Sequence, residues 1–135
     1  MSFPVTIGGG AGAGTERSML IPVFDPATTV SAGTAKKLIL VPEQMDGWKL
    51  VRLQAKVEVA GTTNNLEIQL FNRTKAVNMM SSVTIVASGV VLGTPGTVDT
   101  NNDTVNTDDE INVVIDNVSD TPQTGLSVLA EFEAP

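Results

Sequence analysis

A strict alternation of apolar and polar residues between positions 51 and 70 constrains the fold more than any other feature of this chain. The apolar residues of the first run share one side of an extended chain: Val51, Leu53, Ala55, Val57 and Val59. The second run alternates in the same way through Leu66, Ile68 and Leu70, and residues 60–65 between the runs favour turns. A period of two predicts strands with one face in a core and one in water. We therefore expect the two runs to pair as a hairpin at the centre of a β-sandwich.

Further short runs predict strands at residues 18–24, 36–41, 82–88, 111–116 and 126–132, and no run has the period of an amphipathic helix. The last two runs are expected to pair with each other, and Trp48 is expected to anchor the core or a sheet edge. The pattern predicts an all-β protein, an antiparallel β-sandwich of the jelly-roll kind, with an immunoglobulin-like sandwich as the alternative. Residues 16–135 are long enough to form a single sandwich domain around one core.

Residues 1–15 differ from the rest and predict a flexible N-terminal arm. Five of the seven residues at positions 8–14 are glycine, and ordering such a stretch in isolation costs more entropy than it recovers. Ahead of it, Phe3, Val5 and Ile7 form a small alternating apolar patch, which makes them the candidate contacts with another subunit. The alternative is a terminus that contacts nothing.

Missing residue types exclude several functions. The chain contains no histidine, cysteine or tyrosine, so it lacks a His-based nucleophilic triad, a disulfide and a zinc site built from Cys or His. We therefore expect no enzymatic activity, no cofactor and no metal. No apolar segment is long enough to span a bilayer, and no signal peptide is evident, so we expect a protein made in the cytosol that has no membrane partner.

An acidic loop raises one alternative. Asp99, Asn101, Asp103 and Glu110 are spaced like the ligands of an EF-hand calcium loop, but the position that needs glycine is Thr104. No helices are expected on either side, so an ordinary solvated loop at residues 99–110 competes with a calcium site.

The charge is divided unevenly along the chain. Residues 1–75 hold all eight basic and six acidic residues, whereas residues 76–135 hold nine acidic residues and no basic one. The net charge of −7 makes nucleic acid an unlikely partner, since phosphate neutralisation requires basic residues. The acidic half predicts either a solvated surface or contact with a basic partner or with the basic half of a neighbouring copy.

The sequence LILVPEQMDGWKLVRLQAKVEVAGTTNNLEIQLFNRT, which begins at Leu38, resembles virion structural proteins of tailed bacteriophages. The resemblance extends weakly to about residue 133, and it is greatest to small capsid decoration (cement) proteins. It implies a protein of the virion that binds the outside of the capsid, contacts the major capsid protein and bridges capsid subunits. A homo-oligomer, dimer or trimer, would suit such a lattice. The alternative is a carbohydrate-binding or adhesion module associated with a tail or fibre. The family offers no catalytic residues.

Overall fold

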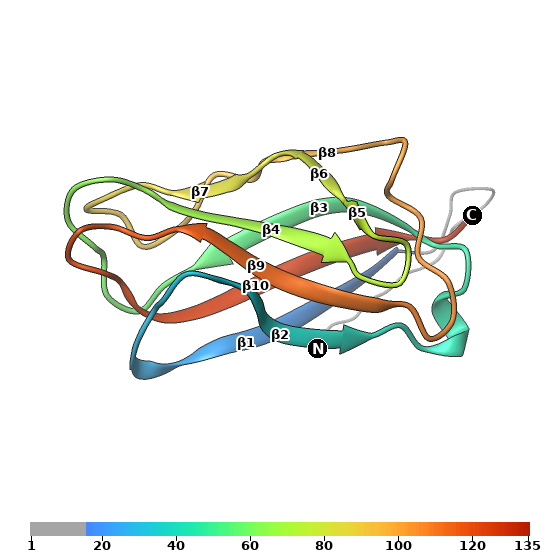
Figure 1. The fold of residues 1–135 in the computed structure, drawn as a ribbon, viewed down its shortest axis with the longest axis horizontal. Coiled ribbons are helices and arrows are strands. Elements are labelled where there is room, and N and C mark those ends of the chain that lie inside the picture. The colour runs from blue at the N-terminus through green and yellow to red at the C-terminus, as the bar shows by residue number, and fades with distance from the viewer. Residues whose placement is uncertain (1–15) are drawn as a thin grey trace.

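The computed structural model describes residues 16–135, which form an all-β sandwich of two antiparallel layers (Figure 1). The first layer, sheet A, has the order β1-β10-β3. Its strands are β1 (Glu16–Thr29), β10 (Thr124–Glu133) and β3 (Lys49–Lys56). Pro22 lies on an edge strand, where the β1 register shifts, and this position suits proline because it cannot donate to a ladder.

The second layer, sheet B, has the order β2-β9-β4-β5, with β7 also paired to β4. Its strands are β2 (Gly33–Leu40), β9 (Glu110–Asn117), β4 (Leu66–Asn72), β5 (Val77–Asn78) and β7 (Thr84–Val86). A separate pair consists of β6 (Met80–Ser82) and β8 (Thr97–Val98), and one short 3-10 helix, η1, spans Glu43–Met45. In residues 16–135, no helix has the length and apolar character to cross a membrane.

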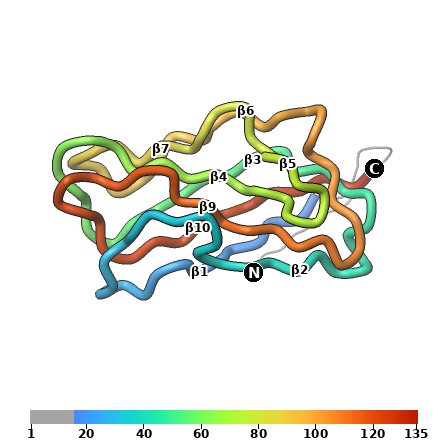
Figure 2. Tube along the Cα trace, in the orientation of Figure 1, coloured from blue at the N-terminus to red at the C-terminus, as the bar shows by residue number. Residues whose placement is uncertain are grey.

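The long strands change layers from one to the next, which is the jelly-roll arrangement. Strands β1 and β3 lie in sheet A, whereas β2 and β4 lie in sheet B, and β9 and β10 are likewise divided between the two sheets. Most pairings of the long strands therefore join strands far apart in the sequence, as the tube in Figure 2 shows for β1 beside β10, whereas β4 and β5 form a local pair. The predicted jelly-roll sandwich is confirmed.

Both predicted hairpins are wrong for the same reason. The runs that form β3 and β4 lie in opposite sheets, and so do the runs that form β9 and β10. Their connections lie together at one end of the sandwich, where Thr62 bridges Thr121 (Figure 2). Alternation requires only that one face of a strand be buried, and a strand across the core satisfies this as well as a neighbour in the same sheet. Periodicity therefore predicted the strands but could not predict their partners.

The buried side chains form a single apolar cluster between the layers. Its largest fully buried members come from both sheets and include Leu53, Leu66, Ile68 and Leu70. The predicted alternation fails at both ends of the run at 51–59: Leu50 is buried, whereas Val51 and Val59 are 43% and 57% exposed. At Val51 the cause is a register shift, because Arg52 and Leu50 lie opposite the consecutive residues Glu131 and Phe132, and such a bulge moves the alternation by one residue. Val59 lies beyond the end of β3.

Three local features differ from what the sequence suggests. An Asp-Pro pair favours a turn, but Asp25-Pro26 is part of β1, which continues to Thr29 through an irregular register. In the run at 82–88, Val83, Ile85 and Ala87 suggest one apolar face, but Thr84 and Val86 are the residues that face the core. The loop at 99–110 is not wholly solvated, since Val105 is fully buried. Trp48 is 8% exposed, which confirms it as a core anchor.

Candidate interaction surface

The outer face of sheet A carries exposed leucines in neighbouring positions. Leu20 of β1 lies opposite Leu129 of β10, which in turn lies opposite Gln54 of β3. Leu92 lies in a segment beside the end of β3 and forms an isolated β-bridge with Lys56. Leu20 is 71% and Leu92 57% exposed, and Leu129 is half-buried. We call Leu20, Leu129 and Leu92 the leucine row.

Strand alternation and one glycine place the leucine row. Leu20 and Leu129 face outward because their neighbours Ile21 and Val128 point into the core. The segment carrying Leu92 is held against β3 by the Gly93 amide, which donates to the Ala55 carbonyl at 2.8 Å. A Cβ at Gly93 would come within 3.0 Å of that carbonyl oxygen, so a larger residue would push the segment away from β3. This close approach therefore depends on glycine.

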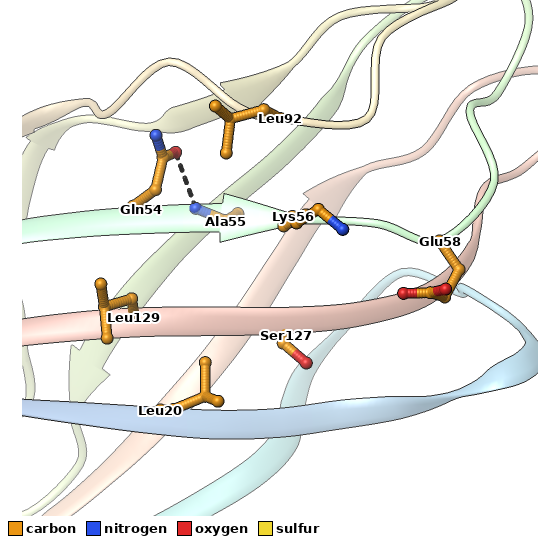
Figure 3. Close-up of a pocket in the computed structure, with 8 residues that line it drawn as sticks. All are labelled: Leu20, Gln54, Ala55, Lys56, Glu58, Leu92, Ser127 and Leu129. Atoms are coloured by element: carbon orange, nitrogen blue, oxygen red, sulfur yellow. Dashed lines mark hydrogen bonds between the residues drawn. The ribbon is translucent and has the colours of Figure 1, made fainter. Parts of the chain in front are cut away.

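The leucine row lines a shallow hollow of about 370 Å³ (Figure 3). The other lining residues are Gln54, Ala55, Lys56, Glu58 and Ser127. The Gln54 side chain folds back so that its Oε1 accepts a hydrogen bond from the Ala55 amide at 2.8 Å (Figure 3). The chain contains no histidine that could act as a general base for Ser127. Apolar side chains surrounded by polar ones suit the binding of a protein segment rather than a chemical reaction.

Sequence reasoning missed this surface, although one signal was present. Leu129 occupies the outward phase of the run at 126–132, alongside Ser127 and Glu131. An apolar residue in the polar phase of a strand marks an exposed apolar site. The residue opposite it, Leu20, could not be inferred, because β1 and β10 are the first and last strands in the sequence.

The predicted contact residues Phe3, Val5 and Ile7 lie outside the described residues, as does the whole predicted arm at 1–15. The described aromatic side chains offer no exposed platform for stacking a sugar. Trp48 and Phe132 are 8% and 2% exposed, and Phe24 and Phe71 are half-buried. The Arg17 guanidinium lies 5.6 Å from the centroid of the Trp48 ring and covers part of it.

The fold mixes the two charge halves of the sequence. Strands from the basic half flank β10 in sheet A and β9 in sheet B, both of which come from the acidic half. Each described ion pair joins one half to the other: Arg52–Glu131, Arg73–Glu110 at 3.4 Å and Lys75–Asp109 at 3.6 Å. Within the two sheets the sequence asymmetry therefore does not become one basic and one acidic face.

The carboxylates of the acidic loop have separate partners. Asp99 accepts hydrogen bonds from the Asn101 amide at 3.0 Å and from Asn102 Nδ2 at 2.8 Å. The bond from Asn102 and then that from Asn101 lower the pKa of Asp99 below its ordinary value. Glu110 pairs with Arg73 instead. Across residues 16–135, no three acidic side chains are grouped to hold a metal ion.

Asp46 ties this loop to the turn after η1. Its Oδ1 accepts from the Thr107 amide at 2.8 Å, from Thr107 Oγ1 at 3.2 Å and from Asn106 Nδ2 at 3.4 Å. The Thr107 amide is the largest cause of the lowered pKa of Asp46, followed by Asn106. These bonds fix the conformation of the loop beside Val105, and they leave the carboxylate satisfied within the chain.

Comparison with known proteins gives a likeness of fold. No family model matches the chain, and no curated protein matches its sequence. A chain of the cyanophage Pam1 capsid asymmetric unit has a similar structure, with a TM-score of 0.55 and 13% sequence identity. The likeness covers 98% of this chain and 94% of that one. The two share a fold.

Proposed function

We propose that this protein is a structural component of a tailed-bacteriophage virion that binds the outside of the capsid and reinforces the shell by bridging capsid subunits. One observation carries the proposal: a capsid asymmetric unit contains a chain of the same fold, matched along 94% of its length. A match over nearly two whole chains means that the complete sandwich corresponds, rather than one common motif. The sequence resemblance, which centres on residues 38–74, supports the same class of protein independently.

The surface chemistry suits stable contact with other proteins. Apolar side chains stand exposed on the described sandwich, among them Leu38 and Leu40 of β2, and polar residues lie opposite both of them. The chain has no histidine or cysteine with which to build a common reaction centre. We therefore assign it a binding role without catalysis, in which the major capsid protein is the principal partner.

The mechanism we propose is reinforcement by mass action. A protein that binds the assembled shell, but not free subunits, shifts the equilibrium toward assembly. Repetition over a symmetric lattice makes many weak contacts strong in total. A homo-oligomer, dimer or trimer, fits this role because closed symmetric assemblies match lattice axes. The proposed division is an arm at 1–15, with contact candidates Phe3, Val5 and Ile7, and a sandwich domain at 16–135.

The test is to compare the heat resistance of particles with and without this protein. Particles that lack it should release their DNA at a lower temperature, and adding the purified chain should restore their heat resistance until the sites on the shell are saturated. An unrelated jelly-roll protein of similar size and charge serves as the control for non-specific stabilisation. Equal heat resistance of the two particles, together with no saturable binding of the added chain, would refute the proposal.

A further inference from the structure

We propose that residues 3–7 lie across the outer face of sheet A of the same chain, with Phe3, Val5 and Ile7 packed on the leucine row. This inference does not depend on the proposed function, and it assigns Phe3, Val5 and Ile7 to a contact within the chain in place of a contact with another subunit. It begins from the described surface: Leu20 and Leu92 are more than half exposed, and both line the same hollow as Leu129. Neighbouring exposed apolar side chains on a small protein usually mark a contact site.

The spacing of residues 3–7 matches the leucine row. An extended segment advances about 3.3 Å per residue, so its apolar side chains at positions 3, 5 and 7 span roughly 13 Å. The leucine row crosses from β1 through β10 and β3 to the segment at 91–93. Those three steps of about 4.8 Å cover roughly 14 Å. Three apolar side chains can therefore meet three leucines if the segment crosses the strands.

The composition of residues 2–7 favours packing on the outer face of sheet A over pairing with an edge of the sheet as an additional strand. Pro4 has no amide hydrogen, so an extended segment containing it makes a poor additional strand. On the face of a sheet this missing donor is no disadvantage. The polar residues Ser2 and Thr6 alternate with the apolar ones and would remain in water. Residues 1–15 contain no charged side chain that burial would have to desolvate.

The segment is close enough to reach its own sheet. Sheet A begins at Glu16, and Leu20 is four residues further, which is about 13 Å along β1. Residues 8–15 can extend to roughly 26 Å, and their glycines accept the positive φ values that a reversal of direction requires. A tethered segment also has an effective concentration in the millimolar range. At micromolar protein, the chain's own segment therefore competes successfully with that of a second copy.

Disulfide trapping tests this contact directly, because the chain contains no cysteine of its own. The test protein carries Val5→Cys and Gln54→Cys, since Gln54 lies beside Leu129 in the hollow. The matched control carries Val5→Cys and Gln69→Cys, because Gln69 is a half-buried glutamine on β4 of sheet B. Both proteins are oxidised mildly at micromolar concentration and separated on a non-reducing gel.

We expect the Gln54 pair to form a cross-linked monomer at least tenfold faster than the Gln69 pair. Equal rates for the two pairs would overturn the proposal. Cross-linked dimers in place of monomers would also overturn it, because the segment would then lie on a second copy.

A second measurement uses the complete chain without cysteines. Val5→Asp places a charge at the centre of the contact and leaves the described residues 16–135 unchanged. We expect the methyl NMR signals of Leu20, Leu129 and Leu92 to shift in this variant, while that of Leu38 on sheet B stays in place. Unchanged signals along the leucine row would contradict the contact. Because neither measurement involves a capsid, its failure is distinct from failure of the proposed function.

Discussion

The two sheets bury equivalent inner faces but present different outer faces. On sheet A, exposed Leu20 lies opposite another leucine, Leu129. On sheet B, the exposed leucines of β2 lie opposite polar residues: Leu38 opposite Asn112, and Leu40 opposite Glu110. Burial of the inner faces forms the core on which folding depends, whereas exposed leucines on the outer faces add little to that core. The outer face of sheet A is therefore the better candidate for a contact with another segment or protein.

The largest expected effect tests the equivalence of the inner faces. Leu53 of sheet A and Leu70 of sheet B are both fully buried. Leu53→Ala and Leu70→Ala should each lower the free energy of unfolding by about 2–5 kcal/mol, because each leaves a cavity in the shared core. Urea denaturation measures both values. A cost below about 1 kcal/mol for only one of them would show that the two layers do not share one core.

A smaller effect tests how the layers are joined. Thr84 of β7, in sheet B, donates through its Oγ1 to the Leu53 carbonyl of sheet A at 2.7 Å and accepts from the Gly96 amide at 3.0 Å. Thr84→Val keeps the shape but removes the hydrogen bond from the buried Leu53 carbonyl and from the partly buried Gly96 amide, so stability should fall by about 1–3 kcal/mol. Thr84→Ser keeps the hydroxyl and should lose less. Denaturation that places the serine variant below the valine variant would contradict this role.

A still smaller effect compares the outer faces. Leu20→Asp removes an apolar cross-strand pair and should lower the free energy of unfolding by about 0.2–1 kcal/mol. Leu38→Asp, the matched change on sheet B, should cost less than Leu20→Asp. Its free energy of unfolding should remain within about 0.5 kcal/mol of the parent. Thermal denaturation of the two variants side by side measures the difference. A greater loss for Leu38→Asp would reverse the comparison between the sheets.

The smallest expected effect is on the loop at residues 99–110 and its contact with Asp46, at acidic pH. The pKa values of Asp46 and Asp99 are lowered in the folded chain by hydrogen bonds to the ionised carboxylates. Their stabilising contribution is therefore complete above the unfolded value near 3.8 and is lost as the pH falls through the lower folded values. We expect the protection factors of the Thr107 and Asn101 amides, which are corrected for the intrinsic exchange rate at each pH, to fall only in that acidic range. Asp46→Asn should abolish the pH dependence at Thr107, and persistence of it would argue against Asp46 as the acceptor.

The sequence predicted what local patterns can specify. Alternation located the strands that became β3, β4, β9 and β10, and the scarcity of helical periods indicated a sandwich. It also predicted burial of Trp48. Pairing was not predictable in this way, because Leu53 and Leu70 have the same alternation whether their strands lie side by side or face each other across the core. The jelly-roll prediction itself implied crossings between layers, and the two expected hairpins were inconsistent with it.

The candidate surface was less predictable than the fold. Leu129 was visible as an apolar residue in a polar phase, but its neighbours Leu20 and Leu92 come from distant parts of the chain and meet only through the strand order. The division of charge along the sequence was also misleading, because pairing between distant strands brings Arg52 to Glu131. Surface properties follow from topology, which local sequence patterns specify poorly.

The most direct test of the proposed capsid role is electron cryomicroscopy of phage particles assembled in the presence of this protein. The account predicts density on the outer surface of the capsid that fits a two-layered sandwich with the strand order β1-β10-β3 in one layer and β2-β9-β4 in the other, in contact with more than one capsid subunit. Density for this sandwich only in the tail or its fibres, or on a single capsid subunit without bridging, would contradict it.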